Sequence, residues 1–134
     1  MSAAVNSTLS TKHSALILFA HGARDPEWAE PFRAIQKAVA ARRSDLVVEL
    51  AFLDLMPPTL SDCVAKLAAD GCGRVTVAPL FLAQGGHLKQ DLPRLVDDAR
   101  AGHPALEIHM LPAIGEVPAV LDAVAGWLVN GVPR

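Results

Sequence analysis

The sequence predicts an α/β fold, with one doubly wound domain built on a four-stranded parallel sheet over residues 15–130. Four short apolar runs alternate along the chain with four segments of helical periodicity, and each run is followed by one such segment. This order gives right-handed crossovers between parallel strands and places helices on both faces of the sheet. The length of 134 residues fits one domain of this kind.

Each predicted strand is a short run of mostly aliphatic residues. The second run is interrupted only by Glu49, and the third is rich in valine, leucine and phenylalanine. Continuous apolar runs, rather than alternating ones, are typical of parallel strands that are buried on both faces. The four predicted strands cover residues 15–20, 46–53, 74–82 and 106–111.

Each predicted helix has apolar residues at steps of three and four, which place them along one side of the helix. We therefore expect four helices that each carry an apolar stripe. The stripes consist of Trp28, Phe32, Ile35 and Val39; of Leu60, Val64 and Leu67; of Leu88, Leu92, Leu95 and Ala99; and of Val117, Val120, Leu121, Val124 and Leu128.

Capping residues agree with these helix boundaries. Asp25 before Pro26 predicts an N-cap followed by proline at the first helical position. Gly71 and Gly102 are placed to end the second and third helices. Pro93 lies within the third stripe, so we expect it either to kink that helix or to begin it afresh after a short first turn.

Composition excludes several classes of function. The net charge is −2, no segment is rich in Lys and Arg, and aromatic residues make up 4% with no tyrosine, so we expect no nucleic-acid partner. No run approaches the roughly 18 apolar residues of a membrane span, so no membrane partner is expected either. Residues 1–14 lack the features of a secretory signal and predict a flexible tail on a cytoplasmic protein. Cys63 and Cys72 form no CxxC pair and predict no disulfide framework.

Candidate functional residues come from one edge of the predicted sheet. Ligands of open parallel sheets bind outside the carboxyl ends of the strands, near the point where the strand order reverses. His21 follows the first strand, Asp54 the second and His87 the third. Imidazole suits first-row transition metals, and two such ligands leave the open positions that a catalytic metal site requires. Each residue alone has an ordinary explanation, such as capping or solvation, and their common edge is what predicts a shared site.

Four neighbouring residues are candidates for substrate binding. Gly85 and Gly86 permit close approach of a bulky ligand, although they also suit a plain loop. Arg24 and Lys89 either bind an anionic substrate or are ordinary surface cations. No functional role is expected for the remaining histidines, which are His13, His103 and His109.

Two segments resemble the signatures of a known family. The segment HGAR at residues 21–24 is similar to the HG[SA]R opening of the short sirohydrochlorin chelatases, the CbiX/SirB group. The segment PLFLAQGGHLKQDLP at residues 79–93 is similar to the family's second signature, which has the form PLFL…GGH…D[IL]P. HGAR alone is a weak signal, whereas the two motifs at this separation are specific. The resemblance runs from about residue 15 to residue 128.

The resemblance implies an activity. Members are class II chelatases that insert cobalt, or in relatives iron or nickel, into sirohydrochlorin without ATP. The metal ion is then a substrate, and no permanently bound cofactor is implied. The metal-facing histidines of the family fall on His21 and His87, and a family glutamate in a segment of form AFLE falls on Asp54. Aspartate is one methylene shorter than glutamate, which puts its reach in question.

The resemblance also implies partners. Sirohydrochlorin carries eight carboxylates, which suit Arg24 and Lys89 as binding cations. Short members resemble half of the double-length chelatases and pair as homodimers. The hydrophobic content of 51% is compatible with such a subunit interface.

Three other interpretations stay open at this point. One is a sirohydrochlorin ferrochelatase in siroheme synthesis rather than a cobaltochelatase in cobalamin synthesis. Another is a flavodoxin-like module that binds a tetrapyrrole, a metal ion or a nucleotide without turnover, although no GxGxxG or P-loop pattern is present. The third is a histidine phosphatase, but such enzymes carry RHG, whereas Ala20 precedes His21 here.

Overall fold

The computed structural model describes residues 13–134, so most of the expected tail of residues 1–14 lies outside the described residues. The domain was expected over residues 15–130, and the helices and strands of the structure extend from Ser14 to Gly131. In chain order the elements are β1 (Ser14–Ala20), η1 (Pro26–Ala29), α2 (Glu30–Arg42), β2 (Leu46–Phe52), α3 (Leu60–Ala69), β3 (Arg74–Pro79), α4 (Gly86–Gly102), β4 (Glu107–Met110), η2 (Ile114–Glu116) and α5 (Pro118–Gly131).

The four strands form one parallel sheet in the order β2-β1-β3-β4, which confirms the predicted fold class. The chain passes from β1 outward to β2 and then crosses β1 to reach β3 on its other side. From β3 it continues outward to β4. The strand order therefore reverses between β1 and β3, where Phe19 is paired in register with Pro79. This is the position at which sheets of this kind bind ligands.

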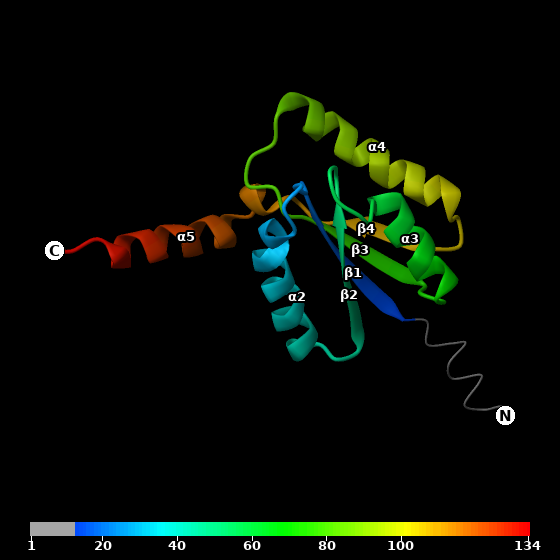
Figure 1. Ribbon diagram of the computed structural model, residues 1–134, viewed down its shortest axis with the longest axis horizontal. Coiled ribbons are helices and arrows are strands. Elements are labelled where there is room, and N and C mark those ends of the chain that lie inside the picture. The colour runs from blue at the N-terminus through cyan, green and yellow to red at the C-terminus, as the bar shows by residue number, and fades with distance from the viewer. Residues whose placement is uncertain (1–12) are drawn as a thin grey trace.

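Helices cover the two faces of the sheet unequally (Figure 1). Helices α3 and α4 pack together on one face, and α2 lies on the other, where it contacts β2 and, to a smaller extent, β1. The main core lies under α3 and α4, because the odd-numbered residues of β1 and β3 point there. Its fully buried members include Ile17, Phe19, Val75, Val77 and Phe81.

The predicted helix boundaries are largely confirmed. The Asp25 carboxylate accepts a hydrogen bond from the Glu27 backbone N–H, and Pro26 opens η1. Gly71, just past α3, has a φ of +90°. Pro93 lies inside α4, which is continuous on both sides of it, so of the two alternatives expected for Pro93, a kink or a fresh start, the fresh start is wrong. Burial of Leu92 and Val96 offsets the one backbone hydrogen bond that proline removes.

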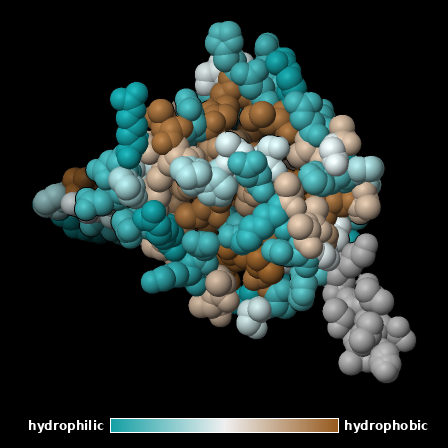
Figure 2. Space-filling view, turned by 45° about the vertical axis from the view of Figure 1, so that its right-hand side comes forward, coloured by the Kyte–Doolittle hydropathy of each residue, from teal (hydrophilic) through white to brown (hydrophobic). Residues whose placement is uncertain are grey.

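Helix α5 forms where expected, but none of its residues is buried. It contacts η2 and projects away from the sheet (Figure 1). The surface narrows toward this projecting helix in Figure 2, in which hydrophobic side chains gather in patches. No helix among residues 13–134 is long and apolar enough to cross a membrane.

Both cysteines are free and buried. Cys63 belongs to α3 and packs in the main core, where burial raises the pKa of its thiol to about 11. Burial also raises the pKa of Cys72. A thiol with a raised pKa holds little of the thiolate form that binds metal ions and reacts with electrophiles.

Candidate metal and substrate site

The predicted metal ligands lie on either side of the point where the strand order reverses. His21 is the first residue after β1, and His87 lies in the first turn of α4, after the loop that leaves β3. Since β1 and β3 are hydrogen-bonded neighbours, their carboxyl ends are adjacent. Both imidazoles are exposed, and no described side chain forms a hydrogen bond to either of them. Their ring nitrogens are therefore available to a ligand.

The loop after β1 is fixed by the loop after β2. The Leu53 N–H donates to the Ala20 carbonyl at 2.8 Å, and the Asp54 N–H donates to the His21 carbonyl at 2.9 Å. Gly22 has a φ of +92°, and a Cβ atom there would lie 2.0 Å from the Asp54 carbonyl oxygen. Only glycine fits this position, because both the conformation and the close approach exclude a side chain. The glycine of HGAR thus sets the backbone that carries His21.

An aromatic contact joins the two histidine-bearing loops. The His21 ring meets the Phe81 ring edge-on, with centroids 4.5 Å apart. Phe81 is 1% exposed and also packs edge-on against Phe19 in β1. The Leu80 N–H donates to the Phe19 carbonyl at 2.8 Å. The chain that leads to His87 is therefore tied to β1 as far as Phe81, directly beneath His21.

Beyond Phe81 the loop is open. Residues 82–87 are exposed except Gln84, which is half-buried, and Leu82 is 63% exposed. Gly85 is the N-cap of α4 in extended conformation, and its carbonyl accepts a hydrogen bond from the Lys89 N–H at 3.1 Å. A Cβ atom at Gly85 or Gly86 would meet nothing within 4 Å. The fold of this chain does not require glycine at either position, and the role of the pair in ligand approach stays a prediction.

Asp54 lies beside His21 through its backbone, but its side chain serves a local turn. One carboxylate oxygen accepts a hydrogen bond from the Leu55 N–H at 2.8 Å, where Leu55 has a φ of 70°. The carboxylate is exposed. In the part of the chain from residue 13 onward, no three or more His, Cys, Asp or Glu side chains are grouped to hold one ion. Joint ligation by His21, His87 and Asp54 stays a prediction.

The two candidate cations are exposed and free of carboxylate partners. Neither Arg24 nor Lys89 forms an ion pair with any residue in the described range 13–134. Unpaired cations at a ligand-binding edge are available to an anionic substrate. By contrast, six cations elsewhere are paired with carboxylates, namely Arg33, Arg43, Lys66, Arg74, Arg94 and Arg100.

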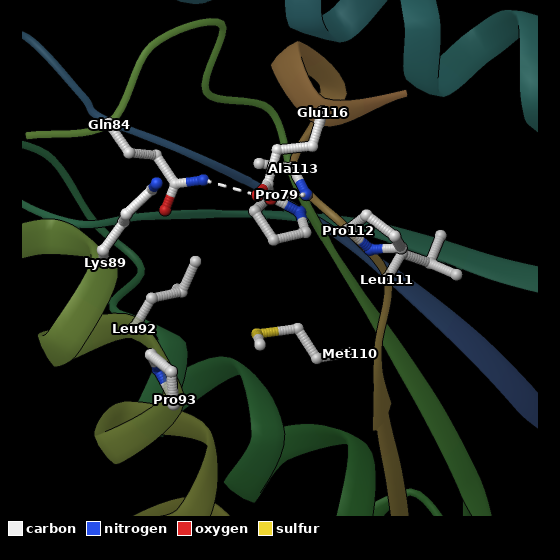
Figure 3. Close-up of a pocket in the computed structure, with 10 residues that line it drawn as sticks. All are labelled: Pro79, Gln84, Lys89, Leu92, Pro93, Met110, Leu111, Pro112, Ala113 and Glu116. Carbon is white, nitrogen blue, oxygen red and sulfur yellow. Dashed lines mark hydrogen bonds between the residues drawn. The ribbon is translucent and has the colours of Figure 1, made fainter. Parts of the chain in front are cut away.

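A cleft of about 330 Å³ opens at the same edge, between α4 and the end of β4 (Figure 3). Lys89 and Gln84 lie on its rim, and Leu92, Pro93 and Met110 supply an apolar wall. Of the predicted site residues, the cleft includes Lys89 alone. The histidines, Arg24 and Asp54 lie outside its lining.

Glu116 is a cleft residue that was not predicted as part of the site. Its carboxylate accepts hydrogen bonds from the Gln84 side-chain amide at 3.4 Å and from the Ala113 N–H at 3.3 Å. Gln84 follows β3 and Glu116 follows β4, so these residues link two strand exits (Figure 3). The sequence signal that could have found this pair is the one that identified His21, namely a position just past the end of a strand.

Known proteins resemble this chain over most of its length. The family model CbiX matches residues 15–128. A sirohydrochlorin cobaltochelatase of Saccharolobus islandicus (strain Y.G.57.14 / Yellowstone #1) is 34% identical over 121 residues, which cover 87% of this chain and 91% of that protein. A sirohydrochlorin cobaltochelatase of Methanosarcina barkeri is 30% identical over 98 residues, which cover 73% of this chain and 75% of that protein.

Solved structures agree with the sequence comparisons. The CbiX protein from Marinobacter aquaeolei VT8 superposes with a TM-score of 0.70 at 30% identity, over 88% of this chain and 99% of that one. The sirohydrochlorin chelatase SirB from Bacillus subtilis subspecies spizizenii, in complex with cobalt, gives a TM-score of 0.72 at 26% identity. That match covers 89% of this chain and 51% of SirB, so this chain corresponds to about half of SirB.

Proposed function

The chain belongs to the CbiX family, and we propose that it is a sirohydrochlorin chelatase, a lyase that inserts a divalent metal ion into sirohydrochlorin without ATP. Co²⁺ is the favoured ion, because the curated relatives are cobaltochelatases. Fe²⁺ and Ni²⁺ are the alternatives, since imidazole accepts all three metals. The metal is a substrate of the reaction and not a resident cofactor.

Besides the comparisons, one structural observation on this chain's own residues supports the proposal. Two exposed imidazoles without hydrogen-bond partners among residues 13–134 follow the two neighbouring strands between which the strand order reverses. The edge-on contact of His21 with Phe81 ties the first histidine to the start of the loop that carries the second. Two imidazoles hold an ion loosely and leave positions free for incoming pyrrole nitrogens.

The reaction requires two further things of the protein. Water must leave the ion, and two N–H protons must leave the macrocycle. An imidazole nitrogen can both bind a metal ion and accept a proton, so His21 and His87 are candidates for both roles. Asp54 is a candidate for accepting a proton or orienting an imidazole after its side chain leaves the Leu55 N–H. Because Asp54 stands where the family has glutamate, the role of Asp54 is the least supported of the three residues' roles.

The substrate is proposed to lie along the edge between the histidines and the cleft. Arg24 and Lys89 flank this path and carry no competing ion pair among the described residues, so they suit the substrate carboxylates. Gly85 and Gly86 leave space for the macrocycle beside His87. The apolar wall of Leu92 and Met110 suits the edge of a pyrrole ring.

The test is an assay of metal insertion, in which the absorbance change of the macrocycle reports the reaction. We expect His21→Ala and His87→Ala each to abolish insertion while the circular dichroism spectrum and the melting temperature stay unchanged. His13→Ala is the matched control, because His13 is also exposed but precedes β1 at the opposite edge of the sheet. Normal insertion by either site variant would refute the assignment of that histidine.

Two measurements separate the alternatives. Multiple turnovers with free metal and sirohydrochlorin distinguish an enzyme from a tetrapyrrole or metal carrier, which stops at one equivalent. Insertion rates for Co²⁺ and Fe²⁺ under the same conditions distinguish a cobaltochelatase from a ferrochelatase. A higher rate with Fe²⁺ would replace the favoured metal and leave the proposed reaction class intact.

We also propose that the working form is a homodimer, because one copy corresponds to about half of SirB. A four-ring macrocycle with eight carboxylates is larger than the cleft of about 330 Å³ in a single copy, and a second copy would supply the missing wall. A cytoplasmic location stays a prediction from the sequence.

A further inference from the structure

The short turn η2, which follows β4, is closed by hydrogen bonds within itself. The Glu116 N–H donates to the Ala113 carbonyl at 2.8 Å, and the Glu116 carboxylate accepts a hydrogen bond from the Ala113 N–H at 3.3 Å. The Val117 N–H donates to the Ile114 carbonyl at 3.2 Å. Ala113 is 3% exposed, so the turn is anchored in the interior at the residue that precedes it. The turn and the end of β4 therefore form one rigid unit.

This turn runs alongside the chain that leaves β3. The Leu111 N–H donates to the Val77 carbonyl at 2.9 Å, at the end of the β3–β4 pairing. Four residues further along each segment, the Gly115 N–H donates to the Phe81 carbonyl at 3.2 Å. The two segments thus keep their alignment beyond the sheet. The alignment brings η2 against the loop that leads to His87.

The contact between η2 and this loop is close. A Cβ atom on Gly115 would lie 1.7 Å from the Leu82 carbonyl oxygen and 2.6 Å from the Leu82 carbonyl carbon. Both are backbone atoms, so no change of side-chain rotamer relieves the contact, and only glycine fits. Next to it, the Gln84 side-chain amide donates to the Glu116 carboxylate at 3.4 Å (Figure 3). The turn therefore contacts the loop at Phe81, Leu82 and Gln84.

A similar contact lies on the other side of the site. A Cβ atom on Gly22 would lie 2.0 Å from the Asp54 carbonyl oxygen, which joins the loop after β1 to the loop after the outer strand β2. At Gly115 the glycine belongs to the loop after the outer strand β4, and the carbonyl belongs to the loop after β3. In both cases the loop after an outer strand fixes the loop that leads to a candidate metal ligand.

The start of α4 has few anchors of its own. Gly85, its N-cap, has no side chain with which to cap the helix, and His87 is exposed. Leu88 is half-buried against the core, and the first buried residue of the helix is Leu92. Two glycines separate His87 from the part of the loop that η2 contacts. The position of His87 therefore depends on the loop before it as well as on the helix after it.

We propose that η2 positions His87, and that Gly115 and Glu116 are positioning residues for metal insertion. The inference rests on the proposed function, because that function assigns His87 to the metal ion. By holding the loop up to the two glycines, η2 confines the movement of His87 to the segment of residues 85–87. The imidazole then stays close to an ion bound at His21. Gly115 and Glu116 act through His87 and not on the reacting atoms.

Two substitutions of Glu116 separate positioning from a chemical role. Glu116→Gln keeps an oxygen that accepts from the Gln84 amide and the Ala113 N–H, whereas Glu116→Ala loses both hydrogen bonds. We expect kcat for Co²⁺ insertion to fall about threefold or more in Glu116→Ala and to stay within about twofold of the wild type in Glu116→Gln. A Glu116→Gln protein as slow as Glu116→Ala would overturn the positioning role, because the charge would then be what matters.

Gly115→Ala displaces the loop and is expected to have the larger effect. We expect kcat to fall about tenfold or more, since small misplacements of a reacting group are costly. Gly102→Ala is the matched control, because Gly102 ends the same helix that carries His87 and a Cβ atom there meets nothing within 4 Å. Val64→Ala controls for lost stability, since Val64 is buried in the core under α3.

Two outcomes of these kinetics would overturn the proposal. One is equal activity of Gly115→Ala and Gly102→Ala. The other is an equal loss of activity in Gly115→Ala and Val64→Ala at similar melting temperatures, because the loss would then follow from lower stability and not from the position of His87.

Nuclear magnetic resonance of the metal-free protein tests the position of His87 without any activity. Gly115→Ala and Glu116→Ala are expected to shift the imidazole resonances of His87 and to leave unchanged those of His103, the C-cap of α4. If Gly115→Ala does not fold, Glu116→Ala gives the same comparison, because Glu116 is exposed. Unchanged His87 resonances in the folded variants would overturn the proposal. Shifted resonances in a protein whose wild type inserts no metal would count against the proposed function alone.

Discussion

The loops that leave β1 and β3 lie side by side, yet they are built differently. The loop after β1 is fixed by backbone hydrogen bonds to the loop after β2 and by a glycine that no other residue can replace. The loop after β3 is buried at Phe81 and then exposed through Gly86, except at the half-buried Gln84, and its two glycines face open space. One candidate metal ligand thus comes from a rigid position and the other from an open one.

This difference suits a protein that must receive a large flat ligand and then release it. A ligand held on two rigid walls must fit a preformed slot, whereas one rigid wall and one open loop admit it from the side. His21 is preorganised by its backbone and by Phe81, and preorganised groups lose little freedom when they bind. His87 is exposed and follows an exposed loop, so its position is expected to respond to the ligand.

The largest expected effect is at the residue where the two loops meet. Phe81→Ala removes a ring that is 1% exposed and contacts both Phe19 and His21, so we expect a loss of about 3–5 kcal/mol in the free energy of unfolding. Leu82→Ala is the control, because the neighbouring leucine is 63% exposed, and we expect a change of less than about 0.5 kcal/mol. Urea denaturation measures both. A loss below about 1 kcal/mol for Phe81→Ala would mean that the loops are not joined there.

The next prediction separates two reasons why a position requires glycine, which are a close approach of other atoms and the backbone conformation. Gly22 and Gly71 have nearly the same φ, +92° and +90°, but a Cβ atom meets the Asp54 carbonyl at Gly22 and nothing within 4 Å at Gly71. We expect Gly71→Ala to cost about 1 kcal/mol from conformation alone, and Gly22→Ala to cost about 3 kcal/mol or more. Equal losses, measured by thermal and urea unfolding, would show that the loop after β2 yields and that His21 is not rigidly held.

Much of this arrangement was predictable from the sequence, because it follows from local rules. The buried runs gave the strands, and Asp25, Pro26 and Gly71 marked helix boundaries that the structure confirms. The position of His21 and Asp54 past strand ends follows from the same pattern. The strand order does not follow from the pattern, because alternation of strands and helices is compatible with several orders. In the order observed, β1 lies beside β3.

What the sequence did not reveal depends on contacts between distant segments. The stripe of α5 has the spacing of a packed helix, and nothing in that spacing indicates that none of the helix's residues is buried in the structure. Glu116 lies 32 residues from Gln84, and their hydrogen bond exists because η2 is fixed against the exit of β3. The turn that occupies the Asp54 carboxylate depends on the left-handed conformation of Leu55, for which the sequence gives no sign.

A smaller effect is expected at Asp54, where turn and chemistry can be separated. Asp54→Ala removes the acceptor for the Leu55 N–H and is expected to cost about 1 kcal/mol and part of the insertion rate. Asp54→Asn keeps an acceptor oxygen, so its stability is expected to match the wild type while the partial loss of rate remains. Unfolding by urea and insertion kinetics give the two readouts. Full activity in Asp54→Asn would reduce Asp54 to a turn residue.

The smallest effect on stability, and the sharpest contrast with Gly22, is expected at the open loop. Gly85→Ala and Gly86→Ala place a methyl group in empty space, so the free energy of unfolding is expected to change by less than about 0.5 kcal/mol. If the glycines serve ligand approach, the same methyl groups obstruct the macrocycle, and KM for sirohydrochlorin rises several-fold while the melting temperature stays constant. Steady-state kinetics measure KM, and thermal unfolding measures the melting temperature of the same variants. Unchanged kinetics in both variants would mean that the macrocycle does not pass over this loop, and the open wall of the site would have to be sought on the other side of His21.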